Sequence, residues 1–101
     1  MTDFGLYILS AGKVVLPHNL REWEEAMENY DARRISLTTL PSGIRISTVF
    51  LGIDCGNEGP PVVFETTIHG GKFDKCQNHY CTIDEAKAGH LAMVEWCKNA
   101  V

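Results

Sequence analysis

Residues 44–71 read IRISTVFLGIDCGNEGPPVVFETTIHGG, and this stretch decides how the chain folds. Two runs rich in β-branched and aromatic residues, 44–53 and 62–68, flank a segment of glycine, asparagine and proline. Such a segment breaks a helix and is typical of a loop between paired strands. We therefore predict a β-hairpin with a long tip at the centre of the chain.

The two arms of this predicted hairpin differ in how apolar and polar residues alternate. Because successive side chains of a strand point to opposite faces, every second residue shares a face. In the second arm one face is largely apolar and carries Val62, Phe64, Thr66 and Ile68. The other face is more polar and carries Val63, Glu65, Thr67 and His69. In the first arm both sets are apolar after Thr48, so this strand is either covered on both sides or shifted by a bulge.

Three further strands are expected before the central stretch. Residues 6–9 and 14–16 are short apolar runs around a turn, which predicts a first hairpin. The alternating run 35–39 predicts another strand, and Pro41-Ser42-Gly43 supplies the turn that leads into the central stretch.

A helix is expected between these strands, over residues 20–30. Asn19 lies three residues ahead of Glu22, which is an Asn-led variant of the capping box. Apolar residues then recur at helical spacing and form one stripe, made of Leu20, Trp23, Met27 and Tyr30. The acidic residues between them are Glu22, Glu24, Glu25 and Glu28. These carboxylates are either a solvated face or an acidic patch for a basic partner.

The C-terminal part of the chain predicts a short edge strand and a second helix. The strand is expected at residues 79–81, and Thr82 with Glu85 forms a capping box that starts a helix over residues 83–98. One side of this helix is formed by Ile83, Ala86, His90, Met93, Val94 and Cys97. Since His90 lies near the middle of that stripe, we expect it to point inward.

The expected order of elements is β-β-α-β-β-β-(β)-α, which favours an α+β fold. It lacks the strand–helix–strand alternation of a doubly wound parallel sheet. We predict an antiparallel sheet with two helices packed on it. A chain of 101 residues is long enough for one core and is expected to form a single domain.

Composition narrows the classes of partner. The formal net charge is −4, whereas neutralising the phosphates of a nucleic acid requires a basic surplus, so we do not expect a nucleic-acid ligand. The chain has neither a run of membrane-spanning length nor a signal peptide, so we expect a cytosolic protein without a membrane partner. In that reducing compartment the cysteines are expected to be thiols, namely Cys55, Cys76, Cys81 and Cys97.

Several polar residues are candidates for a site. Asp54, Glu65, His69 and His90 would act as general acid and base if the fold brought them together, with Thr67 on the same polar strand face. No nucleophile motif accompanies them. The alternative is a structural role in which a buried His90 bonds a backbone carbonyl or Glu65.

A zinc site is a weaker alternative. Cys76, His79 and Cys81, with Cys55 elsewhere, offer the thiolate and imidazole ligands that zinc prefers. Their spacing fits no standard zinc knuckle, and packing explains most scattered thiols. We therefore expect no metal and no cofactor.

The central stretch resembles a widespread group of small proteins from tailed bacteriophages and prophages. The resemblance rests on RISTVFLGID, on GPPVVFETTIHGG, on the Tyr80-Cys81-Thr82 step and on EAKAGH, and it covers roughly residues 44–90. The group carries a histidine where this chain has Cys55, and an aromatic or apolar residue where it has His69. The resemblance implies a phage origin and brings no assigned activity.

These observations favour a non-catalytic phage accessory protein that binds and modulates a host protein in the host cytoplasm. An anti-defence role, such as inhibition of CRISPR, belongs to this class. The acidic helix or an exposed sheet edge would be the binding surface, and a homodimer is also compatible with open edges. The alternatives are a ligand-binding protein or enzyme that uses Glu65, His69 and His90, a zinc-stabilised module, and a virion or assembly component.

Overall fold

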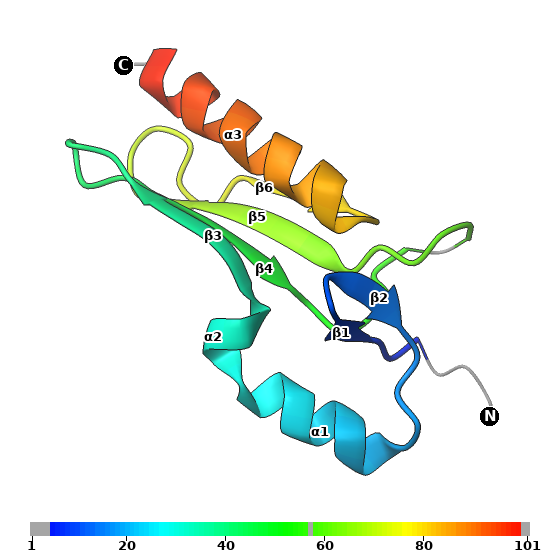
Figure 1. Ribbon diagram of the computed structural model, residues 1–101. Coiled ribbons are helices and arrows are strands. Elements are labelled where there is room, and N and C mark those ends of the chain that lie inside the picture. The colour runs from blue at the N-terminus through cyan, green and yellow to red at the C-terminus, as the bar shows by residue number, and fades with distance from the viewer. Residues whose placement is uncertain (1–4, 57, 100–101) are drawn as a thin grey trace.

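The computed structural model describes residues 5–56 and 58–99, which form an α+β fold (Figure 1). A separate small hairpin consists of β1 (Ile8–Ser10) and β2 (Lys13–Val15). The main sheet is antiparallel and has the order β3-β4-β5-β6. Its strands are β3 (Arg34–Thr39), β4 (Arg45–Phe50), β5 (Phe64–His69) and β6 (Gln77–Tyr80). The helices are α1 (Leu20–Glu28), α2 (Tyr30–Arg33) and α3 (Ile83–Asn99). The predicted fold class is confirmed.

The central hairpin forms as predicted. Strands β4 and β5 pair in continuous register from Arg45 opposite His69 to Phe50 opposite Phe64. The connection between them closes with the amide of Leu51 donating to the Val63 carbonyl at 2.6 Å. This hairpin supplies the two middle strands of the main sheet.

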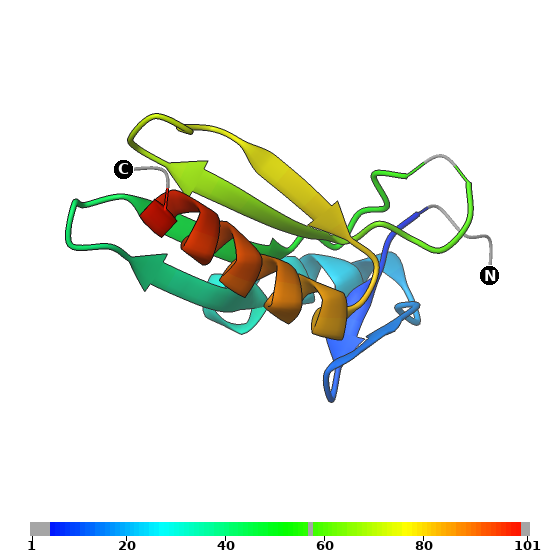
Figure 2. The ribbon, with the colours of Figure 1, turned by 90° about the horizontal axis from the view of Figure 1, so that it is seen from above.

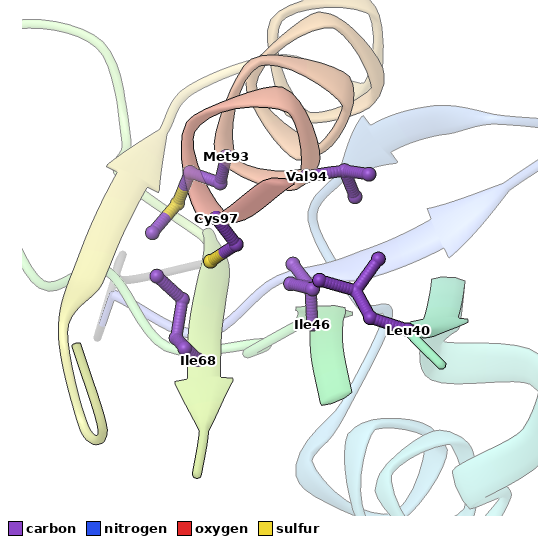
Figure 3. Packing of buried hydrophobic residues seen from close by; sticks show 6 residues of the cluster. All are labelled: Leu40, Ile46, Ile68, Met93, Val94 and Cys97. Atoms are coloured by element: carbon purple, nitrogen blue, oxygen red, sulfur yellow. The ribbon is translucent and has the colours of Figure 1, made fainter. Parts of the chain in front are cut away.

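Helix α3 covers one face of the main sheet along its length (Figures 1 and 2). Its predicted inward stripe is buried, from Ala86 to Cys97. The cluster in Figure 3 shows how the helix meets β4 and β5, with Ile46 and Ile68 fully buried. Its members are Leu40, Ile46, Ile68, Met93, Val94 and Cys97. A second cluster, at the other end of the helix, contains Tyr7, Phe50, Val63, Phe64 and Ala86.

The start of α3 is set by the predicted capping box. The hydroxyl of Thr82 accepts from the Glu85 amide at 3.1 Å, and the Glu85 carboxylate accepts from the Thr82 amide at 3.1 Å. These bonds satisfy backbone donors that have no partner inside the helix.

Helix α1 lies on the opposite side of the main sheet from α3, near one end of that sheet (Figures 1 and 2). Asn19 caps it by accepting from the Glu22 amide at 2.8 Å. The indole of Trp23 donates to the Gly52 carbonyl at 3.0 Å, so the helix is tied to the chain just beyond β4. Only α3 therefore packs along the main sheet, while α1 packs at its end.

The apolar stripe predicted for α1 is only half correct. Trp23 and Met27 are partly buried, but Leu20 is 58% exposed and Tyr30 is 52% exposed. For Tyr30 the reason is that α1 ends at Glu28, where Asn29 leaves helical geometry and caps α2 instead. Tyr30 consequently starts a second helix and does not continue the stripe.

The N-terminal segment covers the chain beyond β4. The amide of Tyr7 donates to the Gly52 carbonyl at 2.8 Å, and Leu6 forms an antiparallel bridge with Ile53. Together with α1, this segment covers part of the first arm after Thr48, where Phe50 and Gly52 are buried. The cover is incomplete, because Val49 is only partly buried and Ile53 is 47% exposed. The bulge of the main sheet lies in β3 between Arg34 and Ser36.

Candidate partner-binding face

One face of the main sheet is left bare by α3. Residues directly opposite each other on paired strands share a face. Ser47 lies between Leu37 and Thr67, while Arg45 lies between Thr39 and His69. We call this side the open face. It carries Leu37, Thr39, Arg45, Ser47, Val49, Glu65, Thr67, His69, Gln77 and His79.

The sheet separates the residues that were candidates for an acid–base site. Glu65 and His69 lie on the open face, whereas His90 belongs to α3 and points to the covered face. Asp54 lies in the loop beyond β4. The fold therefore does not bring these four residues together, because the sheet lies between His90 and the side chains of Glu65 and His69.

His90 is held by threonine hydroxyls. It is 2% exposed, with Nδ1 2.7 Å from Thr48 Oγ1 and Nε2 2.8 Å from Thr38 Oγ1. Thr48 Oγ1 is in turn 2.5 Å from Thr66 Oγ1. Burial lowers the pKa of His90, which favours the neutral ring. The inward orientation is as predicted, but the partners are neither a backbone carbonyl nor Glu65.

Asp54 organises the loop that follows β4. Its Oδ1 accepts from the Gly56 amide at 2.8 Å and from the Val62 amide at 2.9 Å. The bonds from Val62 and Gly56 lower the pKa of the Asp54 carboxyl. This carboxylate holds the two ends of a loop together and is turned toward backbone amides.

Glu65 forms a small polar cluster on the open face. One carboxylate oxygen lies 2.9 Å from His79 Nε2, and the other accepts from the Thr67 hydroxyl at 3.1 Å. The side chains of Glu65 and His79 are 21% and 38% exposed. The cluster therefore joins β5 to the edge strand β6 at the protein surface.

His69 belongs to a different group on the same face. It lines a shallow depression, which we call the basic hollow, together with Tyr30, Arg34, Leu37, Arg45 and Ser47. The Arg34 guanidinium lies over the Tyr30 ring, 5.1 Å from its centroid. Within residues 5–56 and 58–99, neither Arg34 nor Arg45 has a carboxylate within ion-pair distance.

Sequence reasoning missed the two arginines of the basic hollow. A signal for Arg45 was present, because the period of two in residues 44–53 places Arg45 and Ser47 on one face. Nothing in the spacing of the chain linked Arg34 to that face. The link depends on the register between β3 and β4 and on the position of α2.

The acidic helix retains only part of its predicted patch. Glu22 accepts from the His18 amide at 2.7 Å, and this bond is the main cause of the lowered pKa of its carboxyl. Glu25 pairs with Arg21 at 3.2 Å. Across the described residues, Glu24 and Glu28 have no cationic partner. These two exposed carboxylates remain available to another molecule.

The zinc alternative is not supported by the positions of its residues. The part of the chain that the structure describes holds no group of three or more His, Cys, Asp or Glu side chains placed for a metal ion. His79 is bonded to Glu65, and Cys81 Sγ faces the Pro60 carbonyl at 3.8 Å. All four cysteines are free thiols, and burial raises the pKa of Cys97.

Comparisons with known proteins do not assign this face. No protein-family model, curated protein or solved structure matches the chain. Among the described residues, no helix combines the length and the apolar character that crossing a bilayer requires.

Proposed function

We propose that this chain is a non-catalytic binding protein that docks on another protein through the side of the molecule that α3 leaves bare. The open face carries this proposal, because a sheet with one face packed and one face exposed offers a ready surface for a partner. Leu37 on that face is 45% exposed, so an apolar side chain is already presented.

Charge on the bare side suits a protein partner. Helix α1 lies on that side of the sheet and carries Glu24 and Glu28, and the basic hollow contains Arg34 and Arg45. None of these four side chains has an ion-pair partner among the described residues. Patches of both signs set the orientation of a protein partner. Given the resemblance to phage proteins, the proposed partner is a host protein in the host cytoplasm, and a component of host defence is the class to search first.

The proposal is tested by capturing the partner protein from a host lysate and then measuring its affinity for the chain. The tagged chain is incubated with lysate of a bacterial host, and the captured protein is identified and purified. Its affinity for the wild-type chain and for E24K/E28K is then measured by calorimetry. We expect the double charge reversal to weaken binding at least tenfold while the melting temperature is unchanged, since both side chains are exposed.

A matched control places the same charge change elsewhere. Glu58 lies in the loop between β4 and β5, and Glu95 lies on α3 on the covered side of the sheet; both are exposed. E58K/E95K should bind like the wild type. Equal affinity of all three proteins, or a captured protein that does not bind the purified chain, would contradict the proposal.

A further inference from the structure

The basic hollow stands out because its two cations lack internal partners. Arg33, the neighbour of Arg34, donates to the carbonyls of Phe50 and Met27 at 3.1 Å each. Arg34 and Arg45 make no such bonds, and no carboxylate among the described residues pairs with them. Arg33 therefore supports the fold, whereas Arg34 and Arg45 line a surface depression. These two arginines are exposed although the net charge of the chain is −4.

The strand register determines the distance along the sheet between the backbones of Arg34 and Arg45. Arg34 lies opposite Val49, and Arg45 is four residues earlier on the same strand β4. At about 3.4 Å per residue, their backbones are offset by about 14 Å along the sheet. Both side chains nevertheless line the same hollow, with Leu37 and Ser47 between them in the register. Anionic groups roughly 7 to 14 Å apart would meet both guanidinium groups, which is the spacing of every second or fourth residue in an extended peptide.

The rest of the lining indicates a ligand that is only partly charged. Leu37 is 45% exposed and Tyr30 is 52% exposed, so the lining of the hollow includes an accessible apolar and an accessible aromatic residue. Such surfaces contact the methylene groups and backbone of a peptide. Ser47 and His69 add polar groups between the arginines.

We propose that the basic hollow binds an extended acidic segment of the partner protein, with its carboxylates on Arg34 and Arg45. The planar fork of a guanidinium matches a carboxylate with two parallel hydrogen bonds, which gives both charge and orientation. This proposal rests on the proposed function and names the chemistry of one part of that interface.

A long polyanion fits this side of the molecule less well. Helix α1, which carries the exposed Glu24 and Glu28, lies on the side of the sheet that α3 leaves bare. A nucleic acid would also have to overcome the net charge of −4. A short segment with a few carboxylates meets only the two arginines.

The probe for this inference is a synthetic peptide of alternating glutamate and threonine, labelled with a fluorophore. Binding is measured by anisotropy at low salt for the wild type and for R34Q/R45Q. The control variant is K87Q/K98Q, which removes the same charge from the exposed side of α3. We expect R34Q/R45Q to bind at least tenfold more weakly and K87Q/K98Q to bind like the wild type. The matching glutamine–threonine peptide should not bind.

A second measurement does not depend on the variants folding. Titration of the peptide into isotopically labelled wild type should shift the amide resonances of Leu37, Ser47 and His69 before those of α3. Three outcomes would overturn the assignment: absence of peptide binding, equal binding to R34Q/R45Q, and tighter binding of a single-stranded oligonucleotide of equal charge. Self-association of the wild type that R34Q/R45Q abolishes would also overturn it, since a second copy would then be the occupant. None of these results decides the outcome of the capture test, because that test compares the wild type with E24K/E28K. The two proposals can therefore fail separately.

Discussion

Nδ1 of His90 on α3 lies 2.7 Å from Oγ1 of Thr48 on β4, in the layer between the helix and the main sheet. A neutral imidazole has one donor and one acceptor, and the hydroxyls of Thr48 and Thr38 satisfy both. No buried side-chain nitrogen or oxygen of the described residues lacks a partner. This polar layer therefore fixes how α3 sits on the sheet.

Replacing His90 with alanine should lower the free energy of unfolding by about 3 kcal/mol, because it opens a cavity and removes two hydrogen bonds. Urea unfolding followed by circular dichroism measures the change. Leu91 on the same helix is 66% exposed, so L91A is the control and should change stability by less than about 0.5 kcal/mol. Equal effects of the two substitutions would show that the polar layer does not stabilise the fold.

Stability should fall at mildly acidic pH because of His90. Burial lowers the folded-state pKa of His90 below its ordinary value of 6.5, so the unfolded chain binds a proton more readily. The contribution of the buried, neutral His90 to the free energy of unfolding is complete above pH 6.5. It is lost as the pH falls from 6.5 toward the lower pKa of His90 in the folded state. The difference in unfolding free energy between wild type and H90A should therefore shrink when urea titrations are repeated from about pH 7.5 down to about pH 5.

The carboxyl groups of Asp54 and Glu22 change the stability of the fold in a more acidic pH range than His90 does. The lowered pKa of Asp54 and that of Glu22 place their stabilising effects at pH values above their ordinary 3.8 and 4.5, and these effects are lost only at lower pH. They are common to wild type and H90A. A difference that stays constant between about pH 7.5 and about pH 5 would contradict the assignment to His90.

Gly52 should tolerate substitution far less than Gly12. Both have φ of +77°, where a side chain is strained at a cost of about 1 to 2 kcal/mol. A Cβ on Gly12 meets nothing within 4 Å, whereas one on Gly52 would collide with Met27 and approach Trp23 Nε1 at 3.3 Å. The colliding atoms are Sδ and Cε at the flexible end of Met27, so G52A should cost about 1 kcal/mol more than G12A in chemical unfolding. Equal losses of stability for G52A and G12A would mean that α1 moves easily to make room for a side chain at residue 52.

The same substitution in two adjacent arginines should lower stability to different extents. Arg33 donates to two carbonyls at the end of the main sheet, so R33Q should lose about 2 kcal/mol of stability. Arg34 is exposed and lies over the Tyr30 ring, so R34Q should lose less than about 1 kcal/mol. Thermal unfolding of the two variants measures the contrast. A large loss for R34Q would show that this side chain also supports the fold.

Much of the fold was predictable because its signals are local. The runs of β-branched residues on either side of the glycine and proline segment gave β4 and β5, and Thr82 with Glu85 gave the start of α3. The stripe containing His90 followed from helical spacing alone. The end of α1 was missed because Asn29 caps a second helix, a choice that the spacing of Tyr30 did not reveal.

By itself, the sequence determined most of the strands, the start of α1 and of α3, the inward side of α3 and the polar side of β5. These properties depend on neighbours within a few residues. Only the tertiary structure decided that His90 bonds threonines, that Asp54 and Glu65 lie apart, and that Arg34 joins Arg45 on the open face. The reason is that strand register and helix placement depend on contacts between segments far apart in the chain, and no local pattern specifies them.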